Sequence, residues 1–180
     1  VFIGALMGLL LQIVTAALII GGQAISASMG LSMANMVDPN MGNVPVIAQF
    51  LIICSTLIFV GLGGHVIVIS LLLESFQVLP IGQMVQVKSL MALTIEWSSM
   101  MFLGAVMIGL PLMSSLLFIN IGLGVITRAA PALNIFAVGF PAMILAGIVL
   151  LSLSMTSIGF RIQWLWQQSF DTMGQALGLR

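Results

Sequence analysis

The chain has 180 residues, of which 61% are hydrophobic and 4% are charged. Soluble domains carry about 25% charged residues, so this chain lacks the polar surface that a soluble globular fold needs. Its four Lys and Arg residues are too few to neutralise a run of phosphates, which excludes nucleic-acid binding. The apolar content excludes intrinsic disorder. A membrane protein remains.

Four long uncharged stretches divide the chain: residues 1–37, 39–73, 97–127 and 129–160. A helix of about 20 residues is enough to cross a bilayer, and backbone groups in lipid must be paired within their own segment. The sequence therefore predicts an all-α, membrane-type fold. Because Val1 already lies inside an apolar run, we expect the chain to be the C-terminal part of a longer protein.

Glycine interrupts the first two stretches. We expect Gly21-Gly22 to break the first helix, and the helical pattern then fails over the segment 29–41. The second stretch carries the sequence Gly61-Leu62-Gly63-Gly64 at its middle. That sequence has neither the preceding strand nor the following Lys of a phosphate loop, so glycine for close helix packing is the favoured interpretation.

Proline interrupts the third and fourth stretches at Pro111 and Pro141. A proline inside a helix removes a hydrogen bond and kinks it. These residues flank a turn at 128–131, so the sequence predicts a bent helical hairpin over 97–160, preceded by a connector at 83–96.

The last segment, 161–180, differs from the hairpin because apolar and polar residues alternate at helical spacing. This pattern predicts an amphipathic helix that lies at a membrane interface or packs on a partner. The apolar positions are Ile162, Leu165, Trp166, Phe170, Met173 and Leu177, and the polar ones are Gln163, Gln167, Asp171 and Gln175.

Catalytic signatures are poor. His65 and Glu74 are nine residues apart, which places them on opposite faces of a continuous helix. A single His offers no pair of metal ligands at helical spacing. We therefore expect neither enzymatic activity nor a cofactor, and His65 is expected to be a packing residue.

Two charged residues stand at the ends of apolar runs. Glu74 and Arg128 are either solvated helix ends or contact points for another subunit, and Glu74 could also belong to an ion path. The Met-rich segment 29–41 leaves a similar choice. Non-helical backbone at membrane depth must be buried in protein or line a water-filled path, so this segment is a packed re-entrant loop or a pore-facing loop.

Three stretches carry a resemblance to a known family: residues 29–39 (MGLSMANMVDP), 64–82 (GHVIVISLLLESFQVLPIG) and 128–141 (RAAPALNIFAVGFP). In this order they resemble the FliR family, the R subunits of the flagellar type III secretion export gate. These are related to the T subunits of virulence injectisomes.

The resemblance implies a P-like helical part at 1–82, followed by a Q-like bent hairpin at 97–160. It implies one copy assembled with several FliP and FliQ subunits, and with FlhB around the base. The assembly would be the closed entry pore for unfolded flagellar proteins. It would lie in the bacterial inner membrane at the flagellar basal body, with its core raised toward the periplasm.

The resemblance also implies a pore plug within 29–41, and flexible thioethers suit a seal of no fixed shape. The expected plug residues are Met29, Gly30, Leu31, Ser32, Met33, Ala34, Asn35 and Met36. The expected subunit-contact or structural residues are Asp38, Pro39, Glu74, Arg128, Pro131 and Pro141.

Two alternatives stay open from the sequence. Helices broken by Gly and Pro are typical of small-molecule secondary transporters, so a transporter or channel subunit is one alternative. The other is a passive membrane scaffold.

Overall fold

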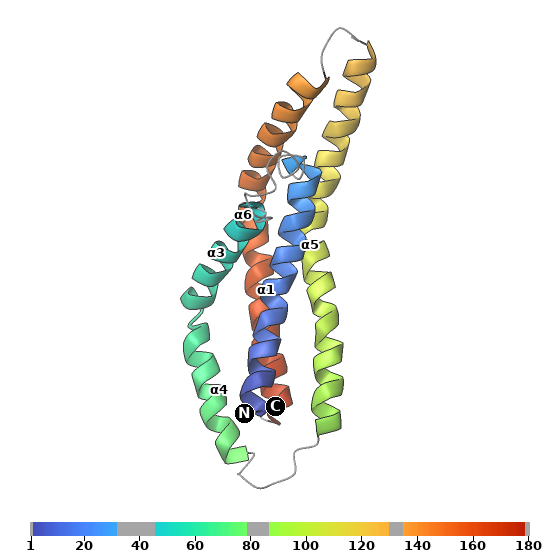
Figure 1. Cartoon of the computed structure of the whole chain (residues 1–180). Coiled ribbons are helices and arrows are strands. Elements are labelled where there is room, and N and C mark those ends of the chain that lie inside the picture. Colours follow the sequence, from blue (N-terminus) through green and yellow to red (C-terminus); the bar gives the residue numbers. More distant parts are fainter. Residues whose placement is uncertain (1, 32–45, 79–86, 130–134, 179–180) are drawn as a thin grey trace, which may run out of the picture.

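The computed structural model describes residues 2–31, 46–78, 87–129 and 135–178. The described residues form an all-α structure, as the sequence predicted (Figure 1). Its helices are α1 (Phe2–Ser28), α3 (Val46–Gly61), α4 (Gly64–Val78), α5 (Val87–Ala129) and α6 (Ile135–Ala176).

Three helical segments are long and apolar enough to cross a membrane: Ile3–Ser28, Leu90–Ala129 and Gly139–Ala176. The pair α3 and α4 passes the same test only when its two helices are taken together as one bent span. The expected four apolar segments are thus present, one of them broken.

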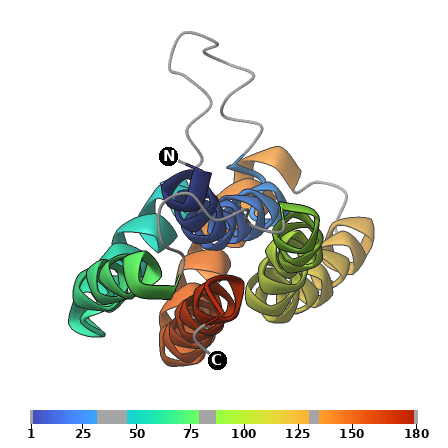
Figure 2. The same cartoon turned by 90° about the horizontal axis from the view of Figure 1, so that it is seen from below.

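The helices form an elongated bundle in which α1 packs on α5, α3 and α6. Both ends of the described chain lie at one end of the bundle, and the end of α5 and the start of α6 lie at the other (Figure 1). Seen from below, α1 and α6 lie between the α3–α4 pair and α5 (Figure 2). Residues at helical spacing on α1 form the core, among them Leu10, Val14 and Leu18, which are nearly inaccessible.

The expected break at Gly21-Gly22 is wrong, because α1 continues through both residues. Their role is close approach between helices. A Cβ atom at Gly21 would lie 3.2 Å from the carbonyl oxygen of Ala105, and one at Gly22 would overlap the backbone of Ala48. The glycines therefore allow α5 and α3 to pack directly on the α1 backbone.

The expected break at Gly61–Gly64 is confirmed. The axes of α3 and α4 differ by 62°, and Gly63 has a φ of +69°, a value that side-chain-bearing residues rarely adopt. A Cβ atom at Gly64 would lie 2.5 Å from the Phe59 ring, so this glycine also provides the expected close packing.

The hairpin helices are longer than expected. Helix α5 begins at Val87, so residues 87–96 of the expected connector are helical, and α6 runs through Arg161 without a break. Lys, Glu and Arg are good helix formers, so a charged residue at the end of an apolar run does not stop a helix. Pro111 and Pro141 both lie inside continuous helices.

The apolar stripe in the last part of α6, which was expected to lie at a membrane interface or on a partner, packs within the chain. The stripe is buried, with Leu165 at 1% and Met173 at 0% exposure. Gln167 and Gln175 are exposed on the opposite side. The amphipathic pattern was read correctly, but its apolar side is covered by other helices of the same chain: Leu165 packs on Gly104 of α5 and Trp166 on Phe59 of α3.

Candidate functional site

The expected plug segment begins where α1 ends. Its first residue, Met29, is an anchor, meaning that its side chain is packed against another helix, α6. Met29 is 1% exposed and its N–H donates to the Ile25 carbonyl at 3.0 Å. The Met29 side chain occupies the space that a Cβ atom at Gly147 of α6 would need. A larger residue at 147 would therefore displace Met29, and the pair fastens the end of α1 to α6.

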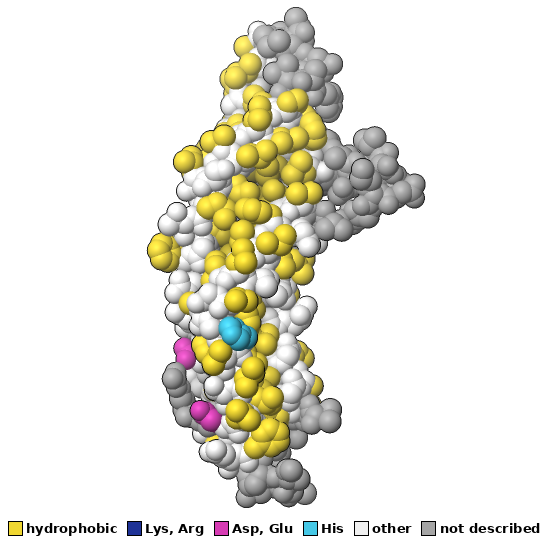
Figure 3. Space-filling model, turned by 90° about the vertical axis from the view of Figure 1, so that its left-hand side faces the viewer, with side chains coloured by type: hydrophobic (Ala, Val, Ile, Leu, Met, Phe, Trp, Pro, Cys, Tyr) yellow, Lys and Arg dark blue, Asp and Glu magenta, His cyan; other side chains and the backbone are white. Residues whose placement is uncertain are grey.

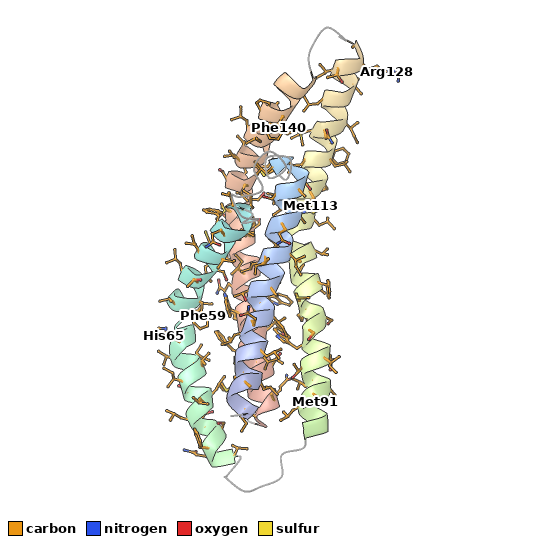
Figure 4. All side chains as sticks on the ribbon, in the orientation of Figure 1. Phe59, His65, Met91, Met113, Arg128 and Phe140 are labelled. Carbon is orange, nitrogen blue, oxygen red and sulfur yellow. The ribbon has the colours of Figure 1, made fainter. Side chains whose placement is uncertain are left out.

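The next two residues extend this anchor. Gly30 has a φ of +79°, which ends the helix, and a Cβ atom there would lie 3.5 Å from the Phe140 ring. Leu31 is half-buried against the core. Figure 4 shows Phe140 on α6 beside the end of α1. The base of the segment is thus fixed between α1 and α6.

The other expected plug residues lie outside the described residues: Ser32, Met33, Ala34, Asn35 and Met36. Asp38, Pro39 and Pro131 lie outside them as well. For these positions, the plug and contact roles stay predictions.

A buried polar junction, which the sequence analysis did not find, joins three helices. The Leu10 carbonyl of α1 accepts hydrogen bonds from Trp97 Nε1 of α5 at 3.2 Å and from Ser169 Oγ of α6 at 3.4 Å. All three residues are at most 5% exposed. A buried Trp N–H needs a hydrogen-bond acceptor. A Trp in an apolar segment was therefore the one sequence signal that could have indicated this junction. The acceptor, a backbone carbonyl, carries no sequence signal.

A second buried polar contact ties α6 to α3. Trp166 Nε1 donates to Ser55 Oγ at 2.9 Å, and Ser55 is 1% exposed. The two polar contacts hold the end of the bundle near the chain termini as one unit.

Glu74 is exposed on α4 and lines a groove between α4 and α6 with a volume of about 500 Å³. The residues that line this groove are Ile67, Ser70, Leu71, Glu74, Gln167, Phe170, Asp171 and Gly174. Asp171 also lines a groove of about 310 Å³ between α5 and α6, together with Glu96 and Trp97.

Three further residues that the sequence analysis singled out do not line this groove. Arg128 is exposed in the last turn of α5 and points away from the bundle (Figure 4), where a cation interacts favourably with the helix dipole. His65 is exposed on α4, so the expectation that it packs inside the chain is wrong. Pro141 lies in the first turns of α6, far along the chain from Glu74.

No group of three His, Cys, Asp or Glu side chains gathers among the described residues. Many large apolar side chains, in contrast, are exposed on the surface of the described residues. Figure 3 shows them along much of the face formed by α3 and α4, with few charged atoms in view. On α5 and α6 the most exposed are Leu153 at 76%, Phe118 at 74%, Ile95 at 73% and Phe160 at 68%.

The sequence profile of the family described as "Bacterial export proteins, family 1" matches residues 1–169. The flagellar biosynthetic protein FliR of Escherichia coli strain K12 is 36% identical over 179 residues, which are 98% of this chain and 68% of the relative. The chain belongs to the FliR family of bacterial export proteins.

Other FliR proteins agree with this assignment. FliR of Pectobacterium carotovorum is 36% identical over 178 residues, covering 98% of this chain and 68% of the relative. FliR of Bacillus subtilis strain 168 is 28% identical over 181 residues, covering 98% and 70%. The resemblance read from the three sequence stretches is therefore confirmed at the level of the family.

Proposed function

We propose that the chain is part of a subunit of the flagellar type III export gate, one copy of which assembles with several FliP and FliQ subunits, with FlhB around the base. The assembly is the closed entry pore for unfolded flagellar proteins. The observation that carries this proposal is the FliR-family match over nearly the whole chain.

The exposed apolar surface supports an assembly. Single soluble chains rarely expose large contiguous apolar patches, and such patches mark contacts with protein or lipid. Here, exposed Leu, Val, Ile and Phe side chains extend over α3, α4 and the outer parts of α5 and α6. Neighbouring subunits and lipid would cover them, and Glu74, Arg128 and Pro141 would be contact or structural points at this surface.

In this proposal the chain has two parts. Residues 1–82 are the P-like part and 97–160 the Q-like hairpin. The gate lies in the bacterial inner membrane at the flagellar basal body, with the hairpin tip toward the cytoplasm and the core raised toward the periplasm. The gate works by conformational change, without catalysis or a cofactor.

The plug proposal gains support from the anchored base of the segment. Because Met29 and Gly30 are held against Gly147 and Phe140, the residues that follow start from a fixed point beside the hairpin. We assign the anchor to Met29–Leu31 and the seal to residues 32–36, because the thioether side chains that Met33 and Met36 supply suit a seal of no fixed shape.

Replacing both Met33 and Met36 by Ala tests the plug. Loss of the two thioethers should raise the leakage of ions through the inner membrane of cells that assemble the gate normally. Met91→Ala is the matched control, since Met91 is 54% exposed on α5, and it should leave leakage unchanged. Normal leakage in the double variant, with normal assembly, would remove these residues from the seal.

Restoration of export tests the function itself. The full-length protein should restore secretion of hook and filament proteins to cells that lack FliR, and the same protein without residues 32–45 should not. Full export by the shortened protein would favour a passive scaffold. Transport of a small solute by the protein reconstituted alone would favour a secondary transporter.

A further inference from the structure

Helices α3 and α4 form one bent pair, but they are held in different ways. Helix α3 is fastened to two other helices. Its Ala48 packs on the α1 backbone at Gly22, and its Ser55 accepts the hydrogen bond from Trp166 of α6. The Phe59 ring then lies 4.7 Å from the Trp166 ring and 5.9 Å from that of Phe170, measured between centroids.

Helix α4 has few such attachments. Of its 15 residues, Gly64 and Ser75 are buried, and the Ser75 hydroxyl donates to the Leu72 carbonyl of its own helix. Apolar side chains along it are exposed, from Val66 at 56% to Leu73 at 62%. Ile67, Val68 and Leu71 are half-buried against the core, and a groove of about 500 Å³ lies between α4 and α6.

The joint between the two helices has the properties of a hinge. Gly63 adopts a φ of +69°, and apart from its chain neighbours no described atom lies within 4 Å of a Cβ atom placed there. Its carbonyl accepts the first hydrogen bond of α4, from the Val66 N–H at 2.8 Å. Glycine changes φ and ψ at little steric cost, and the close contact at the joint is made by the next residue, Gly64, with the Phe59 ring.

We propose that α4 is a hinged arm that turns about Gly63 while α3 stays fixed, so that the width of the groove between α4 and α6 varies. At 1.5 Å per residue α4 is about 22 Å long, and a turn of about 20° moves its far end by about 8 Å. The exposed apolar side chains of α4 move with it as one surface. This motion belongs to the chain itself and does not depend on the proposed export role.

Two spin-label distances measured on the full-length protein in lipid nanodiscs test the arm. With the native thiol removed by Cys54→Ser, one label at Leu153→Cys on α6 serves as the common reference. The second label is placed at Gln77→Cys near the end of α4 or, as the control, at Leu57→Cys on α3. All three label sites are exposed.

The Gln77 pair should show two distances, or one distribution spread over about 8 Å, while the Leu57 pair shows a single narrow distance. Two equally narrow distributions would overturn the proposal. Because no export is measured, a failure here leaves the proposed function untouched.

A glycine pair locates the hinge. Gly63→Ala places a Cβ atom in the left-handed region, which L-residues disfavour, and should shift the Gln77 distance while the Leu57 distance stays the same. Gly61→Ala is the matched control, because Gly61 has similar open space around it without a positive φ, and should shift neither. Equal effects of the two substitutions, or none from either, would overturn a hinge at Gly63.

Discussion

The two halves of α6 are both apolar, but they differ in what covers them. Over residues 162–177, the inner half, Ile162 and Leu165 are each 1% exposed. Over residues 139–160, the outer half, Leu145 is 65% and Leu153 is 76% exposed. The difference shows that hydropathy alone does not set burial, because the outer half has an apolar face that the chain itself leaves exposed.

The reason lies in the arrangement of the bundle. Helix α1 covers the inner half and reaches Gly147 of the outer half through Met29, but it ends before the tip of the hairpin, so the last turns of α5 and the first turns of α6 extend beyond it (Figure 1). The inner half is therefore a finished core. The outer half has one face buried in the chain, with Ile158 at 2% exposure, and one exposed apolar face, which the export-gate proposal assigns to contacts with lipid or other chains.

One substitution made in both halves gives the sharpest test. Leu165→Ala should lower the free energy of unfolding by about 2–5 kcal/mol, because it leaves a cavity in a packed core. Leu153→Ala should change it by less than about 0.5 kcal/mol in the isolated protein. Titration with SDS, followed by circular dichroism, measures both. Similar losses at the two positions would mean that the halves do not differ in packing.

Two glycines of α1 sharpen the comparison within the inner core. Gly22→Ala forces a Cβ atom against the Ala48 backbone and should lower the free energy of unfolding by about 1–3 kcal/mol. Gly8→Ala meets open space and should raise it by about 0.5–1 kcal/mol, because Ala is the better helix former. The same SDS titration reports both, and a stabilising Gly22→Ala would contradict the close contact of α1 and α3.

The smallest expected effect concerns the hydrogen bond between Trp166 and Ser55. A double-mutant cycle of Trp166→Phe and Ser55→Ala should give a coupling of about 1 kcal/mol, since the bond is buried and neutral. Circular dichroism serves here because Trp166→Phe alters fluorescence. A coupling near zero would show that the bond does not help to hold α3 on α6.

The sequence predicted the class of fold, the hairpin and one helix break correctly, and it failed where one residue type has two roles. Gly22 and Gly63 are alike in the sequence, but Gly22 makes room for another backbone and Gly63 adopts a positive φ. What sets Gly22 apart is its contact with Ala48, which lies 26 residues away in the sequence. Local sequence could not provide that information.

The site was predictable to a similar extent. The Met-rich segment was identified, and three matching stretches led to the correct family. The burial of Met29 was not foreseen, because its partner Gly147 lies on a distant helix. The bond from Trp97 to the Leu10 carbonyl was missed for the same reason, since any residue supplies a backbone carbonyl.

Native mass spectrometry of the full-length protein, purified from membranes in mild detergent, tests most directly whether other subunits cover the outer half. The export-gate proposal predicts one copy of the protein together with several copies of FliP and FliQ. Release of the protein alone or as a homo-oligomer would contradict it.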